Sequence, residues 1–242
     1  MTLYGIIGNP LDHSFSRDFF NAKFQREGID AQYLNFPIPD ISAFPDIVAS
    51  HPDLRGLNVT LPYKQAIIPL LDDLSDEARA IGAVNVIGVY QGRLVGYNTD
   101  VVGFRQSLEP LLQPHHTRAL VLGTGGASKA VGHALTQMGI AWQYVSRTAA
   151  ADHLTYGDLD ADIMAAHPLI VNTTPLGMSP HTETCAPLSY HLLTPRHLLY
   201  DVVYNPEETL FMRWGSHYGA ATKGGLEMLH LQALAAWDIW GG

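Results

Sequence analysis

The sequence predicts an α/β protein with two domains, each built on its own sheet. Short runs rich in β-branched and aromatic residues alternate with stretches of helical spacing along the 242 residues, a pattern typical of βαβ units and largely parallel sheets. The pattern breaks at Pro114-His115-His116 and then restarts, which indicates a second sheet. Hydrophobic residues make up 47% of the chain and charged residues 15%, enough apolar material for a sizeable core.

The first series of elements contains strands, a helix and a hairpin. The hairpin is predicted where the runs 83–90 and 94–97 flank Gln91-Gly92-Arg93, whose glycine permits a tight reversal. The earlier elements are strands over 4–8, 31–36 and 56–60 and a helix over 19–27.

The second series begins near Thr117 and ends before a C-terminal helix. Its strands are expected over 118–122, 142–145, 169–172 and 198–203. Apolar residues at helical spacing predict a helix over 226–240, which we expect to pack back onto the first domain. The predicted domains are therefore residues 1–101 with 224–242, and residues 102–223.

Composition and charge exclude several classes of protein. The formal net charge of -9 would repel a polyanion, so nucleic acid is not expected as a partner. No run approaches the roughly 18 apolar residues of a membrane span. The N-terminus lacks the pattern of a signal peptide, and the single Cys185 has no internal partner, so we expect a cytoplasmic protein. The spacing of the histidines does not suggest a metal site.

A glycine-rich segment follows the first strand of the second series. Gly123-Thr124-Gly125-Gly126-Ala127-Ser128 lies between this strand and an expected helix, where glycines let backbone amides approach a pyrophosphate. The sixth position of the usual dinucleotide fingerprint is Ser128 rather than Gly, so a simple strand-to-helix turn is the alternative interpretation.

The end of the next strand favours NADP over NAD. An NAD site would normally place Asp or Glu there for the ribose 2′-hydroxyl, whereas this chain has Ser146-Arg147-Thr148. A guanidinium at this position suits a 2′-phosphate. The alternative is that Arg147 is a solvated loop residue.

Polar side chains follow two strands of the first domain. Ser14 and Ser16 come after the first strand, and Asn58, Thr60 and Lys64 leave another. Together they suit a small polyhydroxylated carboxylate. Helix capping is an equally good explanation for at least one of the two serines.

Asn98-Thr99-Asp100 stands where the chain leaves for the second domain. We expect Asp100 to meet Lys64, because such a pair can exchange a proton with a carbonyl or hydroxyl oxygen while a hydride moves at carbon. Asp100 could also cap the following helix, and this role is compatible with the catalytic one. A Ser-His-Asp hydrolase is disfavoured, because Ser14 is not in a Gly-x-Ser-x-Gly segment and His13 is its neighbour in sequence.

Seven motifs in this order resemble the shikimate dehydrogenase family over almost the whole chain. Besides the glycine loop they are Pro10-Leu11-x-His13-Ser14-x-Ser16, Asn58-Val59-Thr60-x-Pro62-x-Lys64, Gly82-Ala83-Val84-Asn85, Asn98-Thr99-Asp100, Asn172-Thr173-Thr174-Pro175-x-Gly177-Met178 and Gly225-Leu226-x-Met228-Leu229-x-x-Gln232. The resemblance implies a mostly parallel α/β substrate domain and a Rossmann-type NADP-binding domain with a cleft between them. It also implies NADP-dependent interconversion of 3-dehydroshikimate and shikimate.

The resemblance assigns roles to particular residues. Lys64 and Asp100 are implied as the catalytic pair. The implied substrate-binding residues are Ser14, Ser16, Asn58, Thr60, Lys64, Asn85, Asp100, Tyr204 and Gln232. The implied cofactor-binding residues are Gly123, Thr124, Gly125, Gly126, Ala127, Ser146, Arg147, Thr148, Thr173, Val203 and Gly225.

Three departures from the family pattern bear on its details. Ser146 replaces the usual Asn before the arginine, Gly224 stands where an Asp is common, and the chain is short for the family. Two alternatives stay open: an NAD-favouring quinate or shikimate dehydrogenase, and a non-catalytic NADP-binding sensor of the same fold. The expected assembly is a monomer or a homodimer.

Overall fold

The computed structural model describes residues 1–11 and 14–241, which form two compact units, each with a six-stranded sheet of its own. The first unit comprises Met1–Thr99 and the chain from Ala233 onward, and the second comprises Asp100–Gln232. Two separate sheets were predicted. The divisions after Thr99 and Gln232 differ from the boundaries expected at 101 and 223, because α8 (Leu226–Trp240) is continuous across the second division and carries no local signal there.

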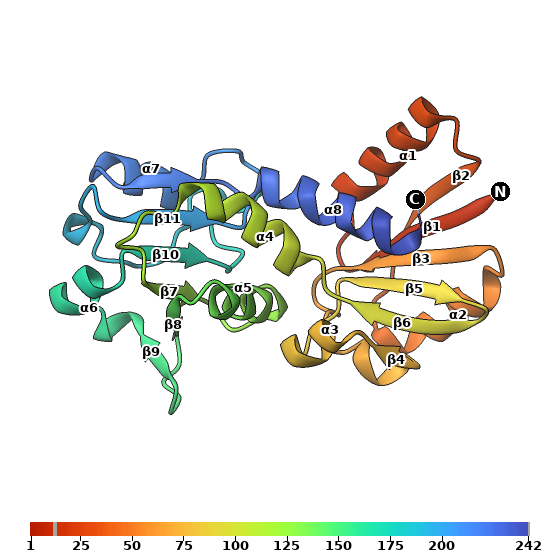
Figure 1. Cartoon of the computed structure of the whole chain (residues 1–242), viewed down its shortest axis with the longest axis horizontal. Helices are drawn as coiled ribbons and strands as arrows, with labels where there is room; N and C mark the ends of the chain where they lie inside the picture. The colour runs from red at the N-terminus through yellow and green to blue at the C-terminus, as the bar shows by residue number, and fades with distance from the viewer. Residues whose placement is uncertain (12–13, 242) are drawn as a thin grey trace. The chain divides into compact units, whose positions relative to one another are not determined.

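The first unit holds a mixed sheet in the order β2-β1-β3-β5-β6-β4 (Figure 1). β2 and β3 both pair in parallel with β1, β5 is antiparallel to β3 and β6, and β4 is parallel to β6. Its strands are β1 (Thr2–Gly8), β2 (Ala31–Pro37), β3 (Leu54–Val59), β4 (Asp73–Leu74), β5 (Val86–Tyr90) and β6 (Arg93–Tyr97). Its helices are α1 (Phe15–Glu27), α2 (Phe44–Ser50) and α3 (Asp76–Ile81), with short 3-10 turns at Ile41–Ala43 and Ile68–Leu70.

Alternation along β1 builds a core on each face of this sheet. Leu3 and Ile7 belong to one core, which includes Phe44 of α2. Tyr4 and Ile6 point to the other face and belong to a core that includes aromatic residues of α1 and α8. That second core contains Phe20, Phe24, Tyr33, Ala233 and Trp237. The end of the C-terminal helix thus packs in the first unit, as predicted, through Ala233 and Trp237, whereas the apolar Leu234 is exposed.

The hairpin between β5 and β6 turns at Gln91 and Gly92, which have φ values of 53° and 83°. Two central residues with positive φ match the right-handed twist of the flanking strands. The hairpin prediction is confirmed, with Arg93 in the second strand rather than in the turn.

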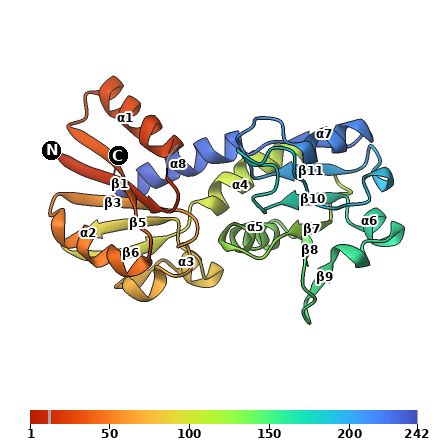
Figure 2. The same cartoon turned by 180° about the vertical axis from the view of Figure 1, so that it is seen from behind.

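The second unit is a doubly wound parallel sheet in the order β12-β11-β10-β7-β8-β9. Figure 2 labels the run from β11 to β9. Counted along this unit, the order is 6-5-4-1-2-3, the arrangement that binds dinucleotides where the strand order reverses. Its strands are β7 (Arg118–Leu122), β8 (Ala141–Ser146), β9 (His153–Thr155), β10 (Leu169–Asn172), β11 (Leu198–Asp201) and β12 (Ala221–Lys223). Its helices are α4 (Asp100–Leu108), α5 (Gly126–Gln137), α6 (Ala161–Ala166), α7 (Leu210–His217) and the first part of α8, with 3-10 turns at Glu109–Leu111, Tyr156–Asp158 and Tyr190–Leu192.

Helix α5 packs closely against the second sheet at a glycine. A Cβ on Gly132 would lie 2.5 Å from the Trp142 ring of β8, so only glycine permits this approach. On the other face, Leu120, Ile170 and Leu199 join Phe211 of α7 in one buried core. Among the described residues, no helix has the length and apolarity needed to cross a bilayer.

Candidate active site

The polar residues predicted in the first unit gather at one edge of its sheet. β1, β3 and β6 run in the same direction, so the segments that follow them leave at the same edge, and β5 starts there because it runs in the opposite direction. Ser14 and Ser16 follow β1, Thr60 and Lys64 follow β3, and Asn85 directly precedes β5. In open α/β sheets, this carboxyl edge is where ligands bind.

A buried chain of hydrogen bonds connects these segments. The Tyr33 hydroxyl donates to Asn58 Oδ1 at 2.6 Å, and Asn58 Nδ2 donates to the Asn85 carbonyl at 3.3 Å. Asn85 Nδ2 donates to Thr99 Oγ1 at 3.0 Å, and its Oδ1 accepts from the Thr99 amide at 2.7 Å. Burial holds the pKa of Tyr33 well above its usual value, against the opposing effect of a hydrogen bond with Ser16, so this hydroxyl remains a donor. The network fixes Asn58 and Asn85 relative to one another.

The two serines have different partners. Ser14 is the N-cap of α1 and accepts from the Arg17 amide at 3.3 Å, so the capping interpretation holds for this residue. Ser16 lies in the first turn of the helix and interacts with the Tyr33 hydroxyl. Both serines are buried, with 7% of their surface exposed. The neighbouring residues Asp12 and His13 of the first motif lie outside the described residues.

Lys64 is half-buried in the segment that follows β3. Its carbonyl accepts from the Val84 amide at 2.7 Å, which ties this segment to the residues just before Asn85. The preceding Tyr63 is buried, and its hydroxyl donates to the Ile38 carbonyl at 2.7 Å. These two hydrogen bonds, one at Lys64 and one at Tyr63, therefore fix the segment that carries Lys64 at the same edge of the sheet as Asn58 and Asn85.

Asp100 and Gln232 belong to the second unit, whereas Lys64 belongs to the first. Asp100 is the first residue of α4, with 5% of its surface exposed. Gln232 Nε2 donates to the Leu229 carbonyl at 2.9 Å, within α8. The pairing of Lys64 with Asp100 and the reach of Gln232 to the substrate stay predictions.

The glycine loop of the second unit lies at the point where its strand order reverses. Gly123 directly follows β7, and Thr173 directly follows the adjacent β10. Gly123 has φ +103°, and a Cβ there would lie 3.0 Å from Thr173 Oγ1, so this position requires glycine. Thr173 Oγ1 donates to the Leu122 carbonyl at 2.6 Å and holds the two strand ends together.

The N-terminus of α5 fits a phosphate group. Gly125 is the N-cap residue, no side chain caps the helix, and a Cβ on Gly125 would meet nothing within 4 Å. The first amides of a helix have no partner within it, and the helix dipole favours an anion there. Ser128 is fully buried, and its hydroxyl donates to the Gly125 carbonyl at 2.7 Å. This bond stabilises the conformation of the loop at the start of α5. These features fit the pyrophosphate of a dinucleotide.

Arg147 lies just beyond β8 and is exposed. The Ser146 hydroxyl donates to the Thr148 carbonyl and accepts from the Thr148 amide at 3.3 Å. Arg147 is therefore the central residue of a short turn. Burial raises the pKa of Tyr156, while the charge of Arg147 lowers it, so these two residues are electrostatic neighbours. The guanidinium has the exposure that contact with a 2′-phosphate requires.

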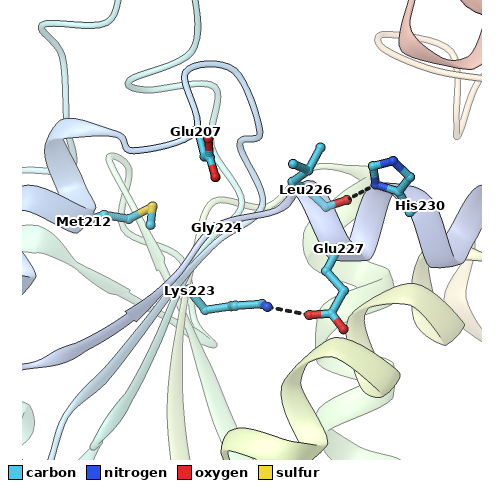
Figure 3. Close-up of a pocket in the computed structure, with 7 residues that line it drawn as sticks. All are labelled: Glu207, Met212, Lys223, Gly224, Leu226, Glu227 and His230. Carbon is cyan, nitrogen blue, oxygen red and sulfur yellow. Dashed lines mark hydrogen bonds and ion pairs between the residues drawn. The ribbon is translucent and has the colours of Figure 1, made fainter.

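An open hollow of about 470 Å³ lies in the second unit, and its lining includes Gly224 and Leu226, the two sequence neighbours of Gly225 (Figure 3). The Gly225 amide donates to the Val203 carbonyl at 3.1 Å, and a side chain on Gly225 would collide with the Val202 carbonyl. The residues that line the hollow come from the segment after β11, from α7, from the end of β12 and from the first turns of α8. They are Glu207, Met212, Lys223, Gly224, Leu226, Glu227 and His230. Lys223 and Glu227, both in this lining, form an ion pair. Tyr204, a predicted substrate residue after β11, is partly buried, and this burial raises the pKa of its hydroxyl.

Two residues that build the polar network of the first unit carry no clear signal in the sequence. Tyr33 looks like an ordinary core residue of an alternating strand, and only its phenol oxygen hinted at a buried polar partner. Thr99 stands out in the sequence only as part of a motif, although it binds both ends of the Asn85 amide. Within 1–11 and 14–241, no group of three or more His, Cys, Asp or Glu residues could hold a metal ion.

Fold and site together define a dinucleotide-binding protein with a second α/β unit that presents buried polar groups. Residues 6–87 match the profile of the shikimate dehydrogenase substrate binding domain. A shikimate dehydrogenase (NADP(+)) of Desulforamulus reducens is 37% identical over 98% of this chain and 89% of its own length. The chain belongs to the shikimate dehydrogenase family.

Solved structures agree with this assignment. A shikimate dehydrogenase from Aquifex aeolicus is 35% identical, with a TM-score of 0.88 over 100% of this chain and 93% of its own. A shikimate 5-dehydrogenase from Thermus thermophilus, solved with NADP(H) and shikimate, is 31% identical, with a TM-score of 0.88 over 100% of this chain and 94% of its own.

Proposed function

We propose that this chain catalyses the reversible, NADP-dependent reduction of 3-dehydroshikimate to shikimate, a step of aromatic amino acid biosynthesis. The observation that carries the proposal is the glycine loop before an uncapped α5, with Arg147 at the end of the neighbouring strand, in a member of this family. The substrate side rests on Lys64 and the buried polar network of the first unit.

Lys64 and Asp100 are the proposed catalytic pair. When bound, NADPH supplies the hydride to the carbonyl carbon of 3-dehydroshikimate. Reduction also requires a proton on the carbonyl oxygen, and we assign to Lys64 the role of donating it or of stabilising the charge that develops there. We assign to Asp100 the roles of orienting Lys64 and of accepting a hydrogen bond from the substrate hydroxyl next to the reacting carbon. In the reverse direction the same lysine takes up the proton of the shikimate hydroxyl.

The substrate is a cyclic carboxylate with several hydroxyl groups, and the proposed contacts match its chemistry. Ser14, Ser16 and Thr60 supply hydroxyls and Asn58 and Asn85 supply amides, so the first unit offers both donors and acceptors. Most of these groups are buried, so water competes with the substrate only weakly. Tyr204 and Gln232 complete the proposed substrate set from the second unit.

The cofactor residues divide by the part of NADP that they meet. We assign the pyrophosphate to the Gly123–Ala127 loop and the N-terminus of α5, and the 2′-phosphate to Arg147 with Ser146 and Thr148. We assign the rest of the site to Thr173 and Val203, which follow β10 and β11, and to Gly225, whose neighbours Gly224 and Leu226 line the hollow of Figure 3.

One assay separates this proposal from its alternatives. We expect the purified protein to reduce NADP when shikimate is added, with a higher kcat/KM for NADP than for NAD and for shikimate than for quinate. Faster turnover with NAD would favour the NAD-dependent alternative. NADP binding without any turnover of shikimate or quinate would favour the sensor. We also propose that the enzyme is cytoplasmic and is a monomer or a homodimer. Sedimentation analysis tests the oligomeric state.

A further inference from the structure

A fully buried carboxylate stands at the carboxyl end of β11, at the same edge as the proposed cofactor site. Asp201 has no exposed surface, and its two oxygens accept three hydrogen bonds from different segments. Oδ1 accepts from Asn172 Nδ2 at 2.9 Å and from the Val203 amide at 3.0 Å. Oδ2 accepts from the Thr209 hydroxyl at 2.6 Å. One side chain therefore binds the end of β10, the segment after β11 and the start of α7.

Its partners extend these contacts into the segments that form the site. Asn172 Oδ1 accepts from the Thr174 amide at 3.1 Å and from the Thr174 hydroxyl at 2.6 Å, which fixes the chain just after Thr173. The Val203 carbonyl accepts from the Gly225 amide at 3.1 Å. Thr209 caps α7 by accepting from the Met212 amide at 3.3 Å. Asp201 thus bonds directly to Val203 and, through Val203, to Gly225. It reaches Thr173 through Asn172, the preceding residue in the chain.

The charge of this carboxylate matters for the arrangement. A carboxylate accepts at both oxygens, and hydrogen bonds to a charged acceptor are roughly twice as strong as neutral ones. A protonated carboxyl, or an amide in its place, must donate from one side and so cannot accept all three bonds. Burial raises the pKa of Asp201 to about 6, while the three hydrogen bonds oppose that rise. The titratable groups that sense its charge are Tyr190, from the 3-10 turn at Tyr190–Leu192, and Tyr200 of β11.

We infer that Asp201 is a positioning residue, whose ionised carboxylate holds the segments after β10 and β11, with Gly225, in the conformation that NADP binding requires. Asp201 acts through Asn172, Val203 and Thr209 rather than by touching the cofactor. The inference rests on the proposed function in one respect, namely that this edge of the sheet binds NADP.

The test is calorimetric titration of NADP into the wild type and Asp201→Asn at pH 7.5 and pH 5. We expect the variant to bind roughly 10-fold more weakly at pH 7.5, because it lacks the charged acceptor. At pH 5 the wild-type carboxyl is itself largely protonated, so the two proteins should bind almost equally. The 2′-phosphate of NADP also titrates near pH 6, but it does so with both proteins and cancels in their ratio.

Two further variants make the result specific. Thr209→Val removes the donor to Oδ2 but keeps the carboxylate, and it should weaken binding several-fold at pH 7.5; it also replaces Asp201→Asn if that variant fails to fold. Ser107→Ala is the matched control, because it removes a buried hydrogen bond of 2.6 Å to Tyr200 on the same strand, and it should leave NADP affinity unchanged. Hydrogen exchange without ligand should show faster exchange at 173–178 and 202–209 in Asp201→Asn at pH 7.5.

Wild-type affinity in Asp201→Asn at pH 7.5, or an affinity ratio that is the same at both pH values, would overturn the inference. A purely structural role would also leave the ratio independent of pH. The proposed function can fail separately. If the NADP affinities of the wild type and Asp201→Asn differ as expected at the two pH values but the wild type does not oxidise shikimate, the reaction is contradicted and the role of Asp201 stands. A wild type that does not bind NADP overturns both.

Discussion

At the scale of single residues, the proposed chemistry depends most on Lys64. Substitution by Ala should lower kcat by roughly 100-fold or more, because the proton donor at the reacting oxygen is lost. NADP affinity, measured by titration, should stay close to that of the wild type. Lys23→Ala is the control, since Lys23 forms an ion pair with Glu27 on α1 and has no assigned role. An unchanged kcat in Lys64→Ala would remove Lys64 from the mechanism.

Cofactor choice is assigned to one exposed side chain. Arg147→Ala should weaken NADP binding by roughly 10- to 150-fold and leave NAD binding nearly unchanged, because the guanidinium forms charge-assisted hydrogen bonds only with the 2′-phosphate. The measurement is kcat/KM for each cofactor in the wild type and the variant. Arg118→Ala, at the start of β7 and also exposed, serves as the control. If the NADP to NAD ratio does not move, the phosphate is recognised elsewhere.

Tyr33 tests the buried network of the first unit. Tyr33→Phe leaves Asn58 Oδ1 without its 2.6 Å donor, so it should lower the free energy of unfolding by about 1–3 kcal/mol and raise KM for shikimate. Tyr90→Phe removes a comparable bond, to the Ile239 carbonyl at 2.8 Å, at the hairpin end of the sheet. That control should leave KM unchanged. Equal KM values in all three proteins would mean that the network does not support the substrate site.

At the scale of elements, the strands with clear apolar runs were predictable and the short ones were not. β4, β9 and β12 have two or three residues each, too few for alternation to be visible, and α3 has only six. The hairpin was predictable because Gly92 marks the turn. Ser14 shows the limit for the site: local pattern allowed both capping and substrate binding, and only the distance to the Arg17 amide established the cap.

Long-range contacts explain why the supporting residues were missed. Tyr33 and Asn58 are 25 positions apart, and Asn172 and Asp201 are 29 apart. Nothing local in the sequence states that such side chains meet, because strand pairing brings them together. The motifs of the glycine loop and Lys64 were found because their chemistry lies within a few consecutive residues.

Helix α5 offers a test of how the cofactor unit is packed. Gly132→Val places a branched side chain where even a Cβ would lie 2.5 Å from the Trp142 ring, so it should lower the free energy of unfolding by about 1–3 kcal/mol. Because the displaced helix carries the glycine loop at its N-terminus, NADP affinity should also fall. Gln137→Val, on the exposed end of the same helix, should change neither. Chemical denaturation and NADP titration give both quantities, and wild-type values in Gly132→Val would contradict the packing.

At the scale of the whole molecule, the proposed cofactor residues all lie in the second unit, whereas most of the proposed substrate residues lie in the first. Shikimate alone should slow hydrogen exchange in the segments after β1 and β3 of the first unit, over 9–11, 14–16 and 58–64. NADP alone should slow exchange in the second unit, over 122–128 and 146–149. Bound ligands stabilise the segments that they contact, so the footprints should be separate. Protection of the glycine loop by shikimate alone would contradict the assignment of ligands to units.

The most direct test of the proposed activity is the absorbance of NADPH after the purified protein is mixed with NADP and shikimate. We expect NADPH formation that depends on shikimate, is faster with NADP than with NAD, and is reduced roughly 100-fold in Lys64→Ala. A wild-type protein that binds NADP and shikimate but forms no NADPH would contradict the central claim.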